Sequence, residues 1–165
     1  ITVRNNLLHS NYLKQIKIFG QNVERPLFKN NFTGFKYSIL SFKSKNKFLA
    51  HEMLKMINKD PDKKQILEIH NRPYLIEEIK RENKFPISLF FHNDPQTMKG
   101  SKSIRERENI LEKCAAIFCV SDFIKKKFLE GVTKNFHKVH VLYNGVEKKL
   151  KKFPKKKKEI LETDL

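Results

Sequence analysis

Two histidines stand where apolar stretches of strand length end. Residues 66–69 lead to His70, and residues 87–91 lead to His92. An imidazole accepts or donates a proton near neutral pH, so each ring is suited to act on a bound hydroxyl group. We predict His92 as the catalytic residue because a rigid strand precedes it. The alternative, for either histidine, is a structural role without a ligand.

Polar side chains that bind hydroxyl or phosphate groups follow each histidine directly. Amides and carboxylates hydrogen-bond hydroxyls, and a guanidinium holds a phosphate or carboxylate through two parallel bonds. We therefore predict a substrate-binding set of His70, Asn71, Arg72, Asn93 and Asp94. Simpler interpretations stay open: Asn71 caps the next helix, Arg72 is solvated, and Asn93 with Asp94 forms an ordinary turn before Pro95.

A basic segment lies just beyond the second strand. Ser103 and Glu106 have the spacing of a capping box, which predicts a helix that begins there. Its positive amino end, together with the neighbouring cations, would attract a phosphate; the alternative is a solvated basic face. The cations are Lys99, Lys102, Arg105 and Arg107, of which Lys99 and Arg105 join the predicted binding set.

Strands that alternate with helices predict an α/β fold with a mainly parallel sheet in a three-layer, Rossmann-like domain. Residues 87–91 are nearly all apolar, as in a strand covered on both faces. We expect residues 66–69, 87–91, 116–120 and 139–142 to be adjacent parallel strands. Earlier strands are predicted at 16–19 and, after a turn at Thr33 and Gly34, at 35–40. Helices are predicted at 47–58, 74–84, 103–113 and 122–130, the last capped by Ser121 and closed by Gly131.

The chain has 165 residues, 39% of them hydrophobic, and a net charge of +17. The length suits one domain with a core. Such a charge favours anionic partners, although the codon bias of an AT-rich genome is an alternative explanation. Residues 148–158 are too dense in lysine to pack. We therefore expect residues 148–165 to form an exposed basic linker or tail that binds anionic surfaces weakly.

Several kinds of site have no counterpart in the sequence. It lacks CxxC and HExxH spacings, so we expect no metal, and it lacks the dinucleotide and P-loop fingerprints, so we expect no cofactor. Of the two cysteines, Cys114 and Cys119, the second lies in a predicted buried strand and is expected to be a small core residue, which fits a reducing cytosol. No apolar run of about 18 residues predicts a transmembrane helix.

Four blocks, in order, resemble the amino-terminal domain of GT-B retaining glycosyltransferases of the lipopolysaccharide and exopolysaccharide type. They are EIHNRP at 68–73, ISLFFHNDPQTM at 87–98, RERENILEKCAAIFCVSDFIKKKF at 105–128 and VHVLYNGVE at 139–147. The resemblance implies a Rossmann-like acceptor-binding domain over residues 1–147. It also implies that His92 lines the cleft and contacts the transferred sugar or the acceptor, and that Asn144 and Gly145 form an interdomain hinge.

The resemblance further implies a second domain that binds the nucleotide-sugar donor, and an opening strand with a Gly-rich loop. Neither is present in this sequence, so we expect the chain alone to be inactive. As the intact protein it would be a hexosyltransferase of polysaccharide or lipopolysaccharide biosynthesis. It would move a sugar from a nucleotide-sugar to a carbohydrate or lipid-linked acceptor, in the cytoplasm and peripherally on the inner face of the membrane.

Two other functions stay open. One is a basic binding module for nucleic acid or an anionic membrane, which the charge favours. No nucleic-acid recognition motif is present, so we expect no specific nucleic-acid partner. The other is an inactive, truncated remnant of a transferase.

Overall fold

The computed structural model describes residues 7–37, 44–59, 64–81, 84–134 and 136–145. The chain divides into two compact units, one of residues 12–143 and the other of residues 1–11 with 144–165. All strands of the described residues belong to the larger unit. The basic segment 148–158 lies outside the described residues, so its exposure stays a prediction.

Four parallel strands form the main sheet, in the order β3-β4-β5-β6. This confirms the predicted α/β fold and the adjacency of the four strands. The strand ends differ from the expected ones by at most one residue; β3 begins after Ile66, whose side chain is 70% exposed. The strands are β3 (Leu67–His70), β4 (Ile87–Phe91), β5 (Ala116–Cys119) and β6 (Val139–Val141).

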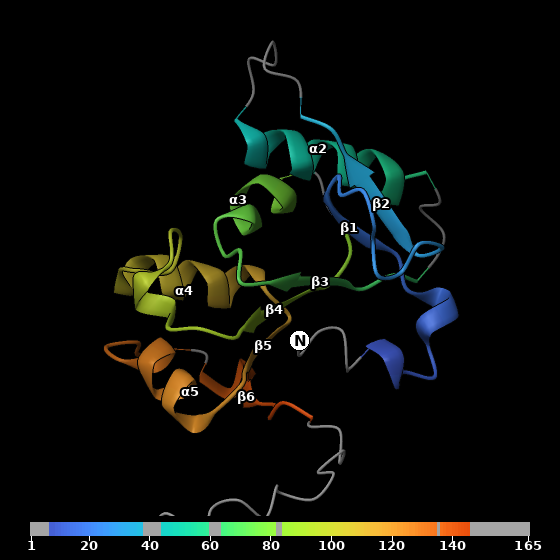
Figure 1. The fold of residues 1–165 in the computed structure, drawn as a ribbon. Helices are drawn as coiled ribbons and strands as arrows, with labels where there is room; N and C mark the ends of the chain where they lie inside the picture. Colours follow the sequence, from blue (N-terminus) through green and yellow to red (C-terminus); the bar gives the residue numbers. More distant parts are fainter. Residues whose placement is uncertain (1–6, 38–43, 60–63, 82–83, 135, 146–165) are drawn as a thin grey trace, which may run out of the picture. The chain divides into compact units, whose positions relative to one another are not determined.

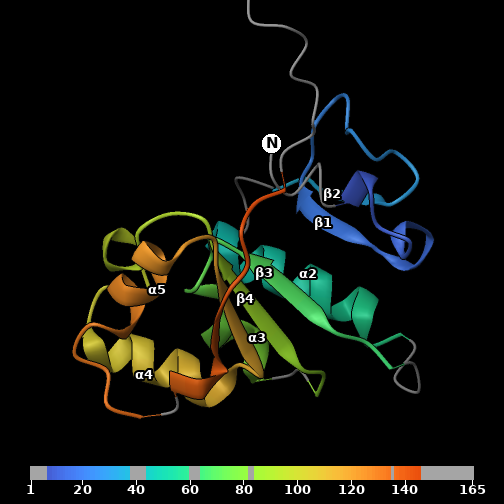
Figure 2. The same ribbon diagram turned by 90° about the horizontal axis from the view of Figure 1, so that it is seen from below.

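Three helices connect these strands and lie on one side of the sheet (Figures 1 and 2). The placement follows from the topology, because right-handed crossovers between strands in sequential order bring every helix to the same face. Each large apolar side chain that these helices bury against the sheet stabilises the unit by about 1.5 to 3 kcal/mol. The helices are α3 (Leu75–Lys80), α4 (Ile104–Lys113) and α5 (Asp122–Leu129), and their buried residues include Ile76, Ile79, Ile110, Leu111, Ile124 and Phe128.

The other face of the sheet is only half buried. In β4, Ile87, Leu89 and Phe91 are buried, whereas Ser88 and Phe90 keep partial exposure, so the expected cover on both faces is complete on one face only. The register places one ring from each strand in a row across this face. Neighbouring centroids in this row, His70, Phe90, Phe118 and His140, are 4.6, 4.7 and 5.7 Å apart.

A second, two-stranded parallel sheet pairs β1 (Ile18–Gln21) with β2 (Phe32–Phe35), and α2 (Lys45–Ile57) follows. The first strand therefore lies two residues after the expected 16–19, and the second ends at Phe35, where the expected strand 35–40 begins. Residues 38–40 of that expected strand lie outside the described part of the chain. Gly34, which we took for a turn residue, lies within β2. A Cβ there would lie 2.7 Å from the side-chain oxygen of Asn22 and 2.8 Å from its Cα, so the close approach of the two segments requires glycine.

Side-chain caps begin the last two helices as the sequence predicts. Ser103 and Glu106 form a complete capping box at α4, and the hydroxyl of Ser121 accepts a hydrogen bond of 3.3 Å from the backbone N–H of Ile124 at α5. Gly131 follows α5 with φ +77°. The helix expected at 74–84 is shorter: its cap residue is Tyr74, and α3 ends at Lys80.

Two glycines with positive φ give a stability test of the loop that follows the His92 strand. A Cβ at Gly100 (φ +90°) would lie 2.7 Å from the backbone N and Cα of Tyr74, whereas one at Gly131 (φ +77°) would meet only the flexible end of Ile104. Gly131→Ala should cost about 1 to 2 kcal/mol from backbone strain, and Gly100→Ala clearly more, because backbone atoms cannot move aside. Urea unfolding of both variants measures this. Equal losses would contradict the close packing of Gly100 on Tyr74.

Candidate active site

The two predicted histidines meet at the carboxyl edge of the sheet. His70 is the last residue of β3, and His92 directly follows β4. Because the strands are parallel and in register, both side chains emerge at the same edge. Nδ1 of His70 lies 3.0 Å from Nε2 of His92, a hydrogen-bond distance, and the rings are stacked at 5.3 Å between centroids. The expected parallel pairing of β3 with β4 thus brings the two rings to one edge of the sheet.

Asn71 holds this arrangement in place. Its backbone turns out of the strand with φ +52°, the left-handed region that asparagine tolerates better than most residues. Its backbone N–H donates to the carbonyl of Phe90 (2.9 Å), and its side-chain oxygen accepts from the N–H of His92 (2.8 Å). That side-chain oxygen replaces the backbone carbonyl that a longer β3 would supply. Asn71 therefore positions His92, and the alternative that it caps the next helix is wrong, since that cap residue is Tyr74.

The carboxylate of Glu68 lies beside the outer nitrogen of His70. Its carboxylate lies 3.7 Å from Nε2 of His70, which favours a proton on that nitrogen. Nδ1 of neutral His70 then carries a lone pair and accepts a hydrogen bond from Nε2–H of His92. We therefore assign a bare lone pair to Nδ1 of His92, an atom without a hydrogen-bond partner among the described residues. The pair can take a proton at Nδ1 of His92 and pass the charge to His70, beside Glu68.

The environment keeps His92 neutral. Partial burial lowers the pKa of His92 below its usual value, and positive charge on the neighbouring His70 lowers it further. Two imidazolium rings at this separation would also place two N–H donors against each other, which disfavours protonation of both rings. A neutral imidazole at a sheet edge is suited to general base catalysis.

The remaining predicted binding residues have separate surroundings. Arg72 is exposed and donates a 3.0 Å hydrogen bond to the hydroxyl of Tyr74, and Asp94 accepts one of 2.9 Å from the backbone N–H of Gln96. Asn93, Lys99 and Arg105 are exposed. Among the described residues, no hydrogen bond links any of these five to the histidine pair. Asn144 and Gly145 are exposed and belong to the other unit.

Arg107 is a structural residue and not a phosphate ligand. Its side chain is only 3% exposed, because α4 turns it inward. Its guanidinium donates to the carbonyls of Ser101 (3.2 Å), Lys102 (2.6 Å) and Glu130 (2.6 Å). The buried hydroxyl of Ser101 donates in turn to the carbonyl of Pro95 (2.6 Å). These bonds fix the loop that follows His92.

Sequence reasoning missed Glu68, and it placed Asn71 in the binding set without its role in positioning His92. Glu68 precedes His70 by two residues, so alternation along a strand places both side chains on one face. That signal was present in the sequence. The hydrogen bond of the Asn71 side chain to His92 had no sequence signal, because it depends on the left-handed turn of the backbone.

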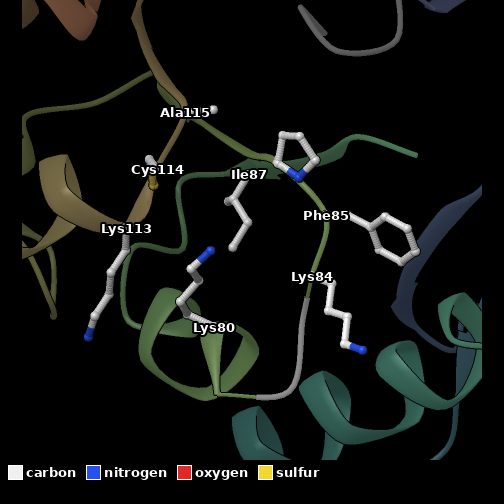
Figure 3. A pocket seen from close by; sticks show the side chains of 8 residues that line it. Lys80, Lys84, Phe85, Ile87, Lys113, Cys114 and Ala115 are labelled. Carbon is white, nitrogen blue, oxygen red and sulfur yellow. The ribbon is translucent and has the colours of Figure 1, made fainter. Parts of the chain in front are cut away.

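A cavity of about 340 Å³ lies at the opposite, amino ends of β4 and β5 (Figure 3). Lys80, Lys84 and Lys113 line it, together with Phe85, Ile87 and Cys114. The side chains of Lys84 and Lys113 point away from each other in Figure 3, and Lys113 is paired with Glu77 at 2.6 Å. Lys80 and Lys113 end their helices, where cations complement the carboxyl ends. We assign this cavity no ligand.

Other kinds of chemistry lack support in the described part of the chain. Burial raises the pKa of both Cys114 and Cys119 to about 12, so neither is a nucleophilic thiolate. Among the described residues, no group of three histidine, cysteine or carboxylate side chains could hold a metal ion. Within those same residues, every helix is too short or too polar to cross a membrane.

Comparison of the sequence with models of known protein families finds no match, and neither does comparison with curated proteins. The resemblance to glycosyltransferases therefore stays a prediction. What the structure adds is the geometry of the residues within the resembling blocks.

The lowered pKa of His92 predicts how stability depends on pH. In the unfolded chain His92 binds a proton near its usual pKa of about 6.5, whereas in the folded chain it does so only at lower pH. The contribution of neutral His92 to the free energy of unfolding is therefore fully present above about pH 6.5, and it is lost as the pH falls toward the pKa of His92 in the folded chain. His92→Gln should flatten this part of the profile, measured by urea unfolding between about pH 5 and 7.5.

His137→Gln is the matched control, because His137 is exposed and lies before β6, away from the carboxyl edge. This variant should leave the His92-dependent part of the profile unchanged. Parallel profiles for wild type and His92→Gln would contradict a depressed pKa for His92.

Proposed function

We propose that this chain is the acceptor-binding half of a glycosyltransferase that moves a sugar from a nucleotide-sugar donor to a hydroxyl of a carbohydrate or lipid-linked acceptor. The observation that carries the proposal is the hydrogen-bonded pair of His70 and His92 at the carboxyl edge of a parallel sheet. In open α/β sheets, ligands bind at this edge. The bare Nδ1 of His92 is suited to accept a proton from a bound hydroxyl.

The residues of the pair belong to the blocks that resemble glycosyltransferases. EIHNRP contains Glu68, His70 and Asn71, and the block that begins at Ile87 contains His92. Each of these four side chains takes part in one connected arrangement: the Glu68 carboxylate beside His70, His70 bonded to His92, and Asn71 bonded to the His92 backbone. This agreement between resemblance and geometry supports a shared role.

In the proposed reaction the acceptor oxygen attacks the anomeric carbon of the donor sugar from the face that the nucleotide diphosphate leaves, so that the anomeric configuration is retained, as the resemblance implies. A new C–O bond forms, and the bond to the nucleotide diphosphate breaks, with its electron pair leaving on phosphate. The acceptor proton passes to Nδ1 of His92 while Nε2–H of His92 moves to Nδ1 of His70. The resulting imidazolium of His70 lies beside the Glu68 carboxylate. The protein acts by orientation and by electrostatic stabilisation of the leaving group, to which Lys99 and Arg105 add positive charge.

Acceptor binding can be tested on this chain directly. The ring resonances of His70 and His92 should shift when methyl glycosides are added, because the hydroxyl groups bond to His92. His92→Gln should weaken the binding roughly fivefold, as expected for the loss of a hydrogen bond worth about 1 kcal/mol. NMR titration measures both effects, and His137→Gln, at an exposed position, should bind like wild type.

Sugar transfer provides a second measurement. With nucleotide-sugar donors and saccharide acceptors, the chain alone should give no transfer, because the proposal assigns donor binding to another domain. Measurable transfer by the chain alone would contradict this division of roles. Absence of any shift in the rings of His70 and His92 across a panel of methyl glycosides would contradict acceptor binding itself.

A further inference from the structure

The small sheet of β1 and β2 is incomplete by itself. None of its residues is buried; all are half-buried or exposed. A two-stranded sheet is marginally stable alone and needs a further strand or a helix to pack against. β1 contacts α2, and Phe19 and Phe35 pack against the core that also contains Leu67 and Ile69 of β3. The two parallel sheets therefore belong to one unit and share one core, but no hydrogen-bonded ladder joins them.

The edge of β1 that faces away from β2 is unpaired. The N–H of Ile18 donates to the carbonyl of Asn31 (2.7 Å), on the β2 side. Because alternate residues of a parallel strand bond each neighbouring strand, the backbone groups of Phe19 and Gln21 point to the side opposite β2. Among the described residues, neither has a backbone hydrogen-bond partner. In Figures 1 and 2, β1 is the strand of the small sheet that lies nearer to β3.

The edge of β3 that faces away from β4 is unpaired in the same way. The N–H of Leu67 donates to the carbonyl of Pro86 (2.9 Å), on the β4 side. By the same alternation, the backbone groups of Glu68 and His70 point away from β4, and no described residue bonds them. Edge strands are commonly protected from further pairing by proline or lysine, and β3 contains neither.

Two unpaired parallel edges on one core match an extended peptide as the occupant. In such strand addition, main-chain hydrogen bonds supply the affinity. We propose that an extended segment of a partner polypeptide inserts between β1 and β3 and joins the two sheets into one. The inserted strand runs parallel to both, as in every strand pair of the two sheets. Its residues alternately bond β1, at Phe19 and Gln21, and β3, at Glu68 and His70.

A second copy of this chain does not fit this position. The occupant bonds a strand on each of its two edges, whereas every strand of the described residues already bonds a neighbour on at least one edge. The occupant is therefore a segment that is free on both edges. The proposal depends on backbone hydrogen bonds alone and is independent of sugar transfer.

Amide hydrogen exchange, followed by NMR, tests the two edges in the free chain. The amides of Phe19, Gln21, Glu68 and His70 should exchange much faster than that of Leu67, which is bonded on the β4 side. Slow exchange at these four amides would overturn the proposal, because the edges would already be paired. Protection that grows with protein concentration would assign the edges to a second copy and would also overturn it.

A synthetic peptide of about seven alternating valine and threonine residues then supplies a strand of ordinary length and high β-propensity. In excess, it should slow exchange of the four edge amides by about tenfold or more. The outer edge of β6 is the internal control. The N–H of Leu142 donates to Cys119 of β5, so that of Val141 points outward, and its exchange should not change. Equal protection of Val141, protection on β3 alone, or no protection would each overturn the proposal.

A proline at one edge tests the position of the peptide. Gln21→Pro removes an N–H from the unpaired edge and blocks the approach of a strand, but it removes no bond to β2. It should weaken peptide binding roughly tenfold, measured by calorimetry, whereas Val141→Pro, the matched control on β6, should bind like wild type. The same peptide with alternate amides N-methylated should not bind, because one of its edges lacks donors. Equal affinity of both peptides would overturn the proposal in favour of side-chain contacts.

Discussion

The in-register parallel pairing of β3 with β4 is the constraint on which the site depends. Ile69 lies beside Leu89 and His70 beside Phe90, so the two strands end at one edge. Buried apolar side chains on the helix-covered face fix that register, since a slip by one residue would turn them to the other face. The same slip would carry His70 to the opposite side and separate it from His92. The chemistry of the site is therefore tied to the packing of the core.

Asn71 converts this strand pairing into a defined side-chain geometry. Its positive φ ends β3, and its amide oxygen continues the hydrogen-bond ladder to the N–H of His92. The loop beyond His92 is fixed separately by Arg107 and Ser101. With the backbone held on both sides, the rings of His70 and His92 lie within hydrogen-bond distance, and Glu68 orders the protons along the pair.

The sequence was most informative where local physics decides the structure. Apolar runs predicted the four strands, and the side chains of Ser103 and Ser121 predicted the helix starts, because a cap depends only on residues within one turn. Gly34 misled the prediction in β2, because glycine there indicated a turn. Its actual role is to leave room for Asn22, which belongs to a separate segment of the chain. Arg107 was counted among the cations that could attract a phosphate, because sequence alone does not reveal that α4 turns it inward. Contacts between segments decide such cases.

The direct test of the account is the hydrogen bond between the two imidazoles. In uniformly ¹⁵N-labelled protein above about pH 7, a scalar coupling across the bond should link Nδ1 of His70 with Nε2 of His92. The proton should reside on Nε2 of His92, and Nδ1 of His92 should show the chemical shift of a bare nitrogen. Two histidines without mutual coupling, each a mixture of tautomers, would contradict the hydrogen-bonded pair and the catalytic role built on it.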